Sequence, residues 1–366
     1  MKTPPKVKRC GGYALLLAAA VLACAGGTAR AQSTVTMFGL LDAGLVRESG
    51  GASGPSTRVS SGVANGSRLG FKGSEALGGG WSALFMLEAG IQLDTGMASQ
   101  GGILFGRQSY VGLASPFGSV TVGRQYTPHF DTLALADPFS SGQVGDAKNL
   151  VPGTGDAYTR MTKAIKYASG VHGGVSAELA WAPGESAGSD STGRQFGGAL
   201  GYAAGGLNLR LGYHYRNTDT PSMRRGGARN ALLAATYSFG AVKAHLGYGV
   251  DKGAGSDAPR NPGNPYALAS PPAGSLDSTD LLLGVTASSG PHTLMASWIR
   301  KDDRTALDLD ARQFALGHRY ALSRRTDTYV ALSRITNRNG AGYTAGNASE
   351  AGTGSRAVSA GIRHQF

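Results

Sequence analysis

Residues that could do chemistry are present in this chain of 366 residues, but they are not grouped in a way that chemistry requires. Nucleophilic catalysis needs a serine or cysteine near a histidine, and a metal centre needs closely spaced histidine, cysteine or carboxylate ligands. The seven histidines and the many serines and aspartates show no recognisable catalytic pattern, and no cysteine–histidine spacing is typical of a metal site. The sequence therefore predicts no enzyme, no cofactor and no metal.

The charged residues instead follow a two-residue period, which the stretch GLNLRLGYHYR (206–216) shows most clearly. Leucines and tyrosines occupy one set of alternate positions, whereas Arg210, His214 and Arg216 fall in the other set. Such alternation indicates a strand with one apolar and one polar face. In a soluble sandwich the apolar face meets a protein core. In a membrane barrel it meets lipid, and the polar face lines a water-filled lumen.

The first residues of the chain favour an exported protein. Basic residues precede the apolar run ALLLAAAVLACA (14–25), which is shorter than the ~20 residues that a transmembrane helix needs. Ala29-Arg30-Ala31 then fits a signal-peptidase site. We interpret residues 1–31 as a secretory signal peptide and 32–366 as one mature domain. Lipidation at Cys24 is an alternative, but Leu22 makes the match poor.

Composition narrows the class further. The formal net charge is +12, which is compatible with a nucleic-acid partner or with a lumen that attracts anions. An export signal, and the lack of any aromatic-stacking or groove-binding motif, argue against nucleic acid. Both cysteines, Cys10 and Cys24, lie in the predicted signal, so we expect a mature chain without disulfides that depends on backbone pairing and burial.

About sixteen alternating segments of ~9–12 residues follow the predicted signal, the length of a tilted membrane strand. Short connectors alternate with long polar ones, for which we expect external loops at 48–60, 127–157, 184–193, 217–229, 252–277 and 338–355. A closed sheet of this size has too wide a lumen to fill with side chains, so it needs lipid on its apolar face. Closure also satisfies every backbone donor and acceptor. The sequence predicts an all-β, 16-stranded antiparallel transmembrane β-barrel.

Several motifs, in this order, resemble those of the general porins of Gram-negative outer membranes, most closely the β-proteobacterial branch. They are STVTMFGLLDAGL (33–45), GSRLGFKGSEALGGG (66–80), ALFMLEAG (83–90), LFGRQSYVGLASPFGSVTVGRQY (104–126), YALSRRT (320–326) and GIRHQF (361–366). The resemblance covers essentially the whole mature chain. It implies passive diffusion of small ions and hydrophilic solutes through a homotrimer, with the third external loop folded into the lumen of each barrel.

The resemblance also implies which residues line the constriction. A basic wall would comprise Arg68, Arg107, Arg124 and Arg160, and alternation from Arg68 adds Lys72 to it. Opposite it, the third loop would contribute the acidic residues Asp131 and Asp137. Guanidinium groups stay charged and would raise the local anion concentration. The same arginines could instead only pair with loop carboxylates and hold the loop. The C-terminal aromatic, Phe366, would be the signal that the outer-membrane assembly machinery reads.

Alternation along the strands gives expectations for individual side chains. Counting from Arg107, Ser109 would line the pore and Tyr110 would face outward. Glu88 would form a buried pair with a wall arginine, and His214 and His245 would be polar lining without a metal.

The functional prediction is a weakly anion-selective diffusion pore of the outer membrane, in contact with its lipid and lipopolysaccharide. A substrate-specific channel for carboxylates or phosphate is the alternative. A barrel enzyme would need a catalytic histidine arrangement that the sequence does not show. A purely structural or adhesive barrel would conduct no ions.

Overall fold

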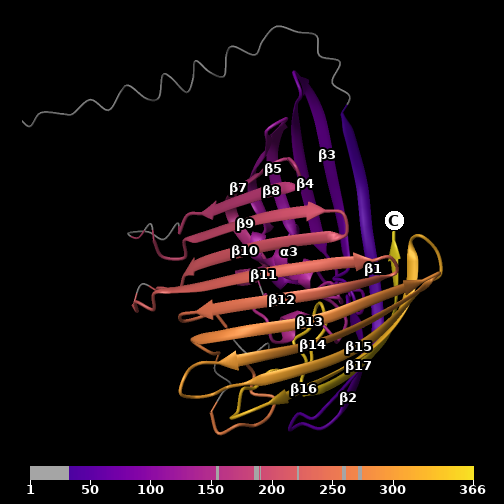
Figure 1. Ribbon diagram of the computed structural model, residues 1–366, viewed down its shortest axis with the longest axis vertical. Helices are drawn as coiled ribbons and strands as arrows, with labels where there is room; N and C mark the ends of the chain where they lie inside the picture. The colour runs from indigo at the N-terminus through magenta and orange to yellow at the C-terminus, as the bar shows by residue number, and fades with distance from the viewer. Residues whose placement is uncertain are drawn as a thin grey trace, which may run out of the picture.

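The computed structural model describes residues 33–153, 156–184, 189, 191–220, 222–257, 261–270 and 274–366. The predicted signal peptide lies outside these residues. Within them the chain forms one antiparallel sheet that closes on itself, because the first strand pairs with the last (Figure 1).

The strand segments follow the order of the chain around the sheet. They are β1 (Thr34–Ser49), β2 (Ser56–Ser61), β3 (Arg68–Gly78), β4 (Trp81–Gly90), β5 (Gln108–Ser115), β6 (Gly118–Tyr126), β7 (Arg160–Ala168), β8 (Val175–Ala182), β9 (Gln195–Ala204), β10 (Leu207–Asn217), β11 (Gly227–Phe239), β12 (Val242–Lys252), β13 (Asp277–Ser289), β14 (His292–Asp303), β15 (Ala311–Ala321), β16 (Thr326–Asn337) and β17 (Arg356–Gln365). The helical segments are α2 (Ser99–Gly102), α3 (Pro128–Ala136), the 3-10 turn η2 (Ala147–Asn149) and α4 (Asp156–Thr159).

Two of the segments, β2 and β3, make up a single barrel strand that is interrupted at residues 62–67. Both pair with β1, which sets Ala43 opposite Ser61 and Leu40 opposite Arg68. Counted this way, the described chain forms the 16-stranded antiparallel barrel that the alternation predicts. On its other side β1 pairs with β17, and this pairing closes the cylinder.

One buried carboxylate holds the interruption in place. The Asp42 side chain accepts hydrogen bonds from the backbone N–H groups of Val63, Ala64 and Asn65 and, at 2.8 Å, from the Tyr329 hydroxyl. These contacts replace the strand ladder that residues 62–67 lack. A buried acceptor with four donors keeps this irregular segment in one position.

The two faces of the strands differ as the sequence predicts. On β10, Leu211 and Tyr213 point out of the barrel and are 51% and 41% exposed, whereas His214 points inward and is 1% exposed. Exposed leucine, valine and aromatic side chains continue around the outside of the wall. Such a surface suits lipid, because there every backbone group of the closed sheet is already paired.

Connections alternate between short turns at one end of the barrel and longer segments at the other. Gly205 and Gly240 have φ values of 56° and 64° in two of the short turns, a conformation that glycine adopts without strain. The first long connection is shorter than predicted, because strand pairing extends to Ser49 and resumes at Ser56. Two further long connections, 91–107 and 304–310, were not expected from the sequence.

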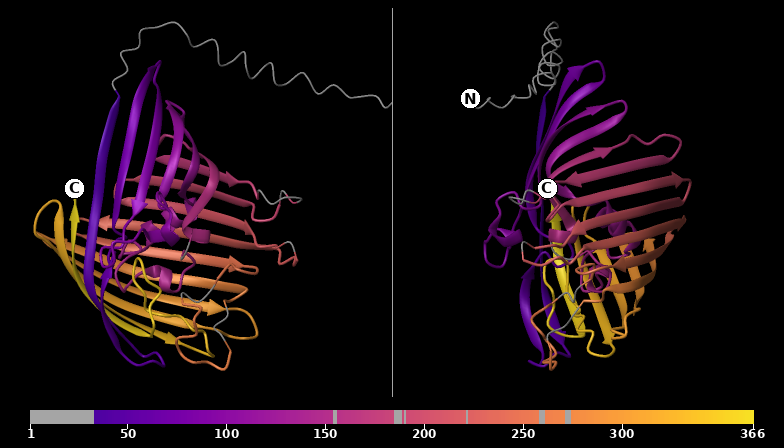
Figure 2. Two further views of the ribbon diagram at one scale, coloured as in Figure 1. Left: turned by 180° about the vertical axis from the view of Figure 1, so that it is seen from behind. Right: turned by 90° about the vertical axis from the view of Figure 1, so that its left-hand side faces the viewer.

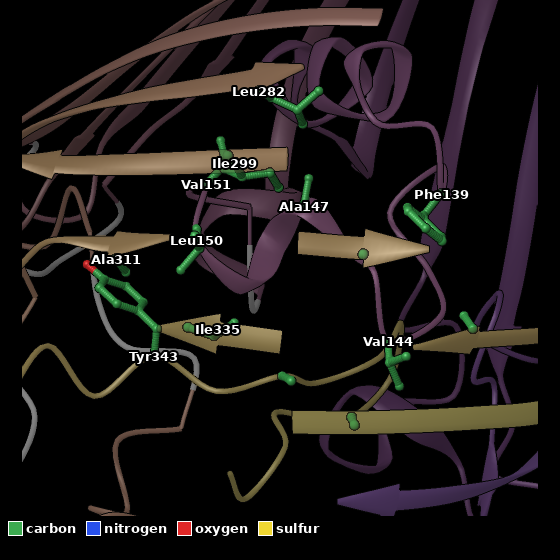
Figure 3. Packing of buried hydrophobic residues seen from close by; sticks show 14 of the residues in the cluster. Phe139, Val144, Ala147, Leu150, Val151, Leu282, Ile299, Ala311, Ile335 and Tyr343 are labelled. Atoms are coloured by element: carbon green, nitrogen blue, oxygen red, sulfur yellow. The ribbon is translucent and has the colours of Figure 1, made fainter. Parts of the chain in front are cut away.

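The third long connection, residues 127–159, packs against the inner side of the wall (Figure 2). Thr127 caps α3 by accepting from the N–H of Phe130, and Pro128 stands at the first helical position. Arg210 on β10 donates to Thr132 at 3.1 Å. The remainder of the loop contributes apolar side chains to a buried cluster with β11, β13–β16 and the last long loop (Figure 3). The cluster includes Phe139, Val144, Ala147 and Leu150 from the third loop, and Leu282, Ile299 and Tyr343 from elsewhere.

In the described part of the chain, no helix is long and apolar enough to cross a membrane.

Candidate functional site

A cavity with a volume of about 630 Å³ lies beside the third loop. Wall residues Arg68, Arg107 and Arg160 line it, and they come from β3, the approach to β5, and β7. Three of the predicted wall arginines therefore meet in one cavity. The basic side chain of Lys148 also reaches it, whereas Asp94 and Glu350 are the acidic residues of its lining.

A buried carboxylate fixes two of these arginines. Glu88 on β4 is 2% exposed and lies 3.3 Å from Nη1 of Arg68 and 3.2 Å from Nε of Arg107. Gln108 donates to its other oxygen at 3.0 Å. The prediction that Glu88 forms a buried pair with a wall arginine is confirmed. One carboxylate shared by two guanidinium groups leaves this part of the wall with a net positive charge.

The phenol of Tyr126 joins Arg107 to the third arginine, Arg160. Its oxygen accepts from Nη2 of Arg107 at 2.7 Å and lies 3.5 Å from Nη2 of Arg160. The Arg160 guanidinium also lies over the Tyr126 ring, 4.9 Å from its centroid, and its Nε donates to the Arg107 carbonyl at 2.8 Å. Cation–π contact and charge-assisted hydrogen bonds together fix the guanidinium planes.

Two predicted wall residues lie apart from the cavity. Arg124 is 8% exposed and its Nε donates to the Gly106 carbonyl at 2.7 Å, so it fastens the segment that precedes β5. Lys72 is on the inner face of β3, where its ammonium lies 5.6 Å from the centroid of the Phe38 ring. Neither residue is among those that line the cavity.

Asp131 contacts a second group of charges, on the other side of α3. Its carboxylate lies 3.4 Å from Nζ of Lys166. The same Nζ is 2.9 Å from Glu178, which in turn pairs with Arg210 at 2.9 Å. These four alternating charges connect α3 to β7, β8 and β10, and Asp131 thereby helps to hold the loop against the wall.

The expected position of Asp137 at the constriction needs correction. Its carboxylate is 1% exposed and lies inside the loop, where it accepts from the N–H groups of Phe139, Ser141 and Ala147 at 2.9–3.0 Å. Burial and the neighbouring Asp146 raise the pKa of the Asp137 carboxyl above its usual range. The side chain shapes the turn after α3 and does not face water.

The expected orientations on β5 are also wrong. Val111 and Leu113 are 60% and 47% exposed on the outer face, so Ser109 shares that face, and Tyr110 faces inward with Gln108. Arg107 precedes the first ladder pair of β5, and alternation cannot be counted through a residue outside the ladder.

The inward-facing histidines are less exposed to water than the sequence predicts. His214 is 1% exposed under α3 and bonds to Gln195 at 3.1 Å, and His245 bonds to Thr286 at 3.1 Å. Across the described ranges no group of three or more histidine, cysteine, aspartate or glutamate residues could hold a metal ion.

Some lining residues were missed by the sequence argument. Tyr126 ends the motif GRQY, and an aromatic directly after a wall arginine could have indicated it. Lys148 and the segment 348–351 reach the cavity only because two loops meet, since Nζ of Lys148 donates to the Ala348 carbonyl at 3.4 Å. No local pattern carries that information.

A closed transmembrane barrel with a charged, water-accessible cavity inside its wall belongs to the class of membrane channels. The sequence comparison defines the family: residues 18–340 match the Gram-negative porins, and the chain belongs to that family.

Relatives along nearly the full length support the assignment. The chain is 33% identical to outer membrane porin protein 32 of Delftia acidovorans, over 96% of this chain and 99% of the relative. It is 29% identical to an outer membrane porin protein of Bordetella pertussis, again over 96% of this chain and 99% of the relative.

Solved structures agree with the fold. The anion-selective porin from Comamonas acidovorans superposes with a TM-score of 0.74 at 29% identity, covering 92% of this chain and all of that one. OmpF of Salmonella typhi, at 15% identity, has a TM-score of 0.66, over 91% of this chain and 97% of that one, and shows the shared fold alone. This protein is an outer-membrane porin, and its family and fold indicate a channel rather than an enzyme.

Proposed function

We propose that the barrel conducts small hydrophilic solutes and prefers anions weakly over cations. The observation that carries the proposal is the cluster of Arg68, Arg107 and Arg160 around one cavity, in which Glu88 is the shared counter-ion of Arg68 and Arg107. Guanidinium groups keep their charge at any physiological pH. In a narrow channel with low-dielectric walls they raise the concentration of anions and repel cations. The anion-selective porin from Comamonas acidovorans has the same fold, which adds support.

Ion selectivity in planar bilayers tests this proposal. Under a salt gradient of KCl, the reversal potential should show chloride preferred over potassium. Arg107→Ala should lower the permeability ratio by about three- to fivefold, because removing one charge near the ion path changes its energy by ~1 kcal/mol in a water-like medium.

Arg300→Ala is the matched control for this measurement. Arg300 lies on β14, half-exposed on the outer face, so its replacement removes the same net charge outside the bore. An unchanged ratio in Arg107→Ala, or a cation preference in the unmodified protein, would contradict the proposal.

We further propose how the chain is processed and assembled. Residues 1–31 would be removed on export and 32–366 would form the barrel. Three copies would associate in contact with outer-membrane lipid and lipopolysaccharide. Phe366 follows β17 and pairs by two backbone hydrogen bonds with Gly39, which supports a role for the C-terminal strand in assembly. N-terminal sequencing of the exported protein, and its mass in mild detergent, test these points.

A further inference from the structure

Two aromatic rings lie among the arginines of the cavity. Tyr126 ends β6 and Phe130 lies in the first turn of α3, with ring centroids 5.2 Å apart and planes inclined by 25°. Both rings line the cavity and both are partly exposed. A phenyl ring in a water-filled channel does not attract inorganic anions, so its exposure there calls for another explanation.

The cavity lining therefore combines polar and apolar side chains. Arg107 and Arg160 both use the Tyr126 oxygen as an acceptor, which leaves the hydroxyl proton available to a bound anion. Phe130, Ile91 and Ala134 are apolar residues of the same lining. This combination matches a ligand that joins an anionic group to a flat apolar body.

We propose that the cavity is a transient binding subsite for small aromatic carboxylates. The carboxylate would lie against Arg68 and Arg107, whose guanidinium groups are already held by Glu88. The aromatic ring would pack on Phe130, beside the stacked phenol. The inference rests on the proposed anion-conducting function, because a carboxylate must first enter the bore.

Block of the chloride current in single channels tests this inference, with benzoate, cyclohexanecarboxylate and acetate as probes. The first two share size and charge and differ in the flat π-face, whereas acetate has no ring. Benzoate should reach half-block at a concentration roughly three- to tenfold below that of cyclohexanecarboxylate, the range expected for one aromatic pair. Acetate should block least.

Variants at one position separate a ligand contact from a structural role. In Phe130→Leu, benzoate and cyclohexanecarboxylate should reach half-block at similar concentrations. In Phe130→Tyr, the difference between the two half-block concentrations should remain. Phe117→Leu is the matched control, because that side chain is 77% exposed in the turn between β5 and β6. If the stack only fastened α3 to β6, Phe130→Leu would change the block by all three probes equally.

Two results would overturn the subsite. One is equal block by benzoate and cyclohexanecarboxylate in the unmodified protein, which decides the question even if Phe130→Leu does not fold. The other is undiminished discrimination in folded Phe130→Leu. A cation preference in the reversal potential would instead reject the proposed function, and that measurement does not depend on these probes.

Discussion

At the scale of single residues, the charge of the wall depends on Glu88. Its carboxylate lies within 3.3 Å of both Arg68 and Arg107, and it is the nearest counter-charge to either group in the described chain. Removing one partner of a buried ion pair leaves the other charges uncompensated and typically costs about 3–5 kcal/mol. Arg68 is partly exposed, so water will lessen that cost.

Glu88→Gln should therefore have two effects. The folded barrel should melt at a lower temperature in detergent, and its preference for chloride should increase because one negative charge is gone from the wall. Glu75→Gln, on the exposed part of β3, should change neither property. An unchanged permeability ratio in folded Glu88→Gln would show that the carboxylate does not influence passing ions.

At the scale of elements, the close approach of α3 to β10 depends on a glycine. A Cβ atom at Gly212 would lie 2.3 Å from Oγ1 of Thr132, so no side chain fits there without moving the helix. Overpacking of this kind costs about 1–3 kcal/mol. Gly212→Ala should displace α3 into the bore and reduce the single-channel conductance.

Gly198→Ala provides the comparison for Gly212→Ala. The nearest atom to a Cβ at Gly198 is 3.6 Å away, an ordinary contact on the outer face, so conductance should stay unchanged. Equal conductance in both variants would mean that α3 adjusts without narrowing the pore.

The same helix should respond to pH through His129. Burial lowers the pKa of His129 to about 4, against 6.5 for an exposed histidine. The docked helix therefore keeps the ring neutral, and its docking free energy is fully present above pH 6.5. Between pH 6.5 and 4 the His129 ring becomes protonated in the undocked loop but stays neutral in the docked loop. This difference weakens docking by up to about 3 kcal/mol.

Hydrogen exchange in α3 measures this effect of pH. Protection of the helix, corrected for intrinsic exchange, should fall from pH 6.5 towards 4 in the unmodified protein, and His129→Gln should flatten the profile. His172→Gln, on an exposed turn, should leave the profile as it was. A profile that His129→Gln does not alter would assign the pH dependence to other groups.

At the scale of the whole molecule, closure of the cylinder relies on the contact between its two ends. The N–H groups of Gly39 and Phe366 each donate to the other's carbonyl, at 3.0 and 3.1 Å. A Cβ at Gly39 would lie 2.2 Å from the Phe366 ring. Gly39→Val should therefore lower the yield of heat-resistant barrel on refolding.

A second substitution tests whether that clash is the cause. Phe366→Ala combined with Gly39→Val should recover part of the refolding yield, because it empties the space that valine needs. No recovery, measured by the mobility shift of folded barrels in gels, would point to the backbone of Gly39 instead.

Much of this architecture is readable from the sequence because a membrane barrel offers each strand only two environments. Strict alternation in β10 predicted both the outward tyrosines and the inward Arg210. The count of about sixteen strands followed from the same reasoning, whereas the buried pair of Glu88 also needed the wall arginines that the family resemblance implies. Counting failed at Arg107, which lies outside the ladder, and so it gave Tyr110 the wrong face.

The interior of the constriction was harder to predict because it depends on contacts between distant segments. Asp137 looked like an acidic group of the constriction, but three backbone donors from its own loop enclose it. Lys148 reaches the cavity through the last long loop, 200 residues further along the chain. Such contacts between distant segments form only in the folded barrel, and no periodic pattern in the sequence predicts them.

The interruption in the second barrel strand has a consequence for how such channels diversify. Residues 62–67 leave the ladder and contribute Asn65 and Gly66 to the cavity, while the Asp42 carboxylate accepts from three of their backbone N–H groups. Insertions or amino-acid substitutions within this short stretch can therefore change the width of the pore. The hydrogen-bonded strands on either side would keep their register. The wall of the barrel can thus stay constant among related channels while the segment bound to Asp42 varies and sets the pore width.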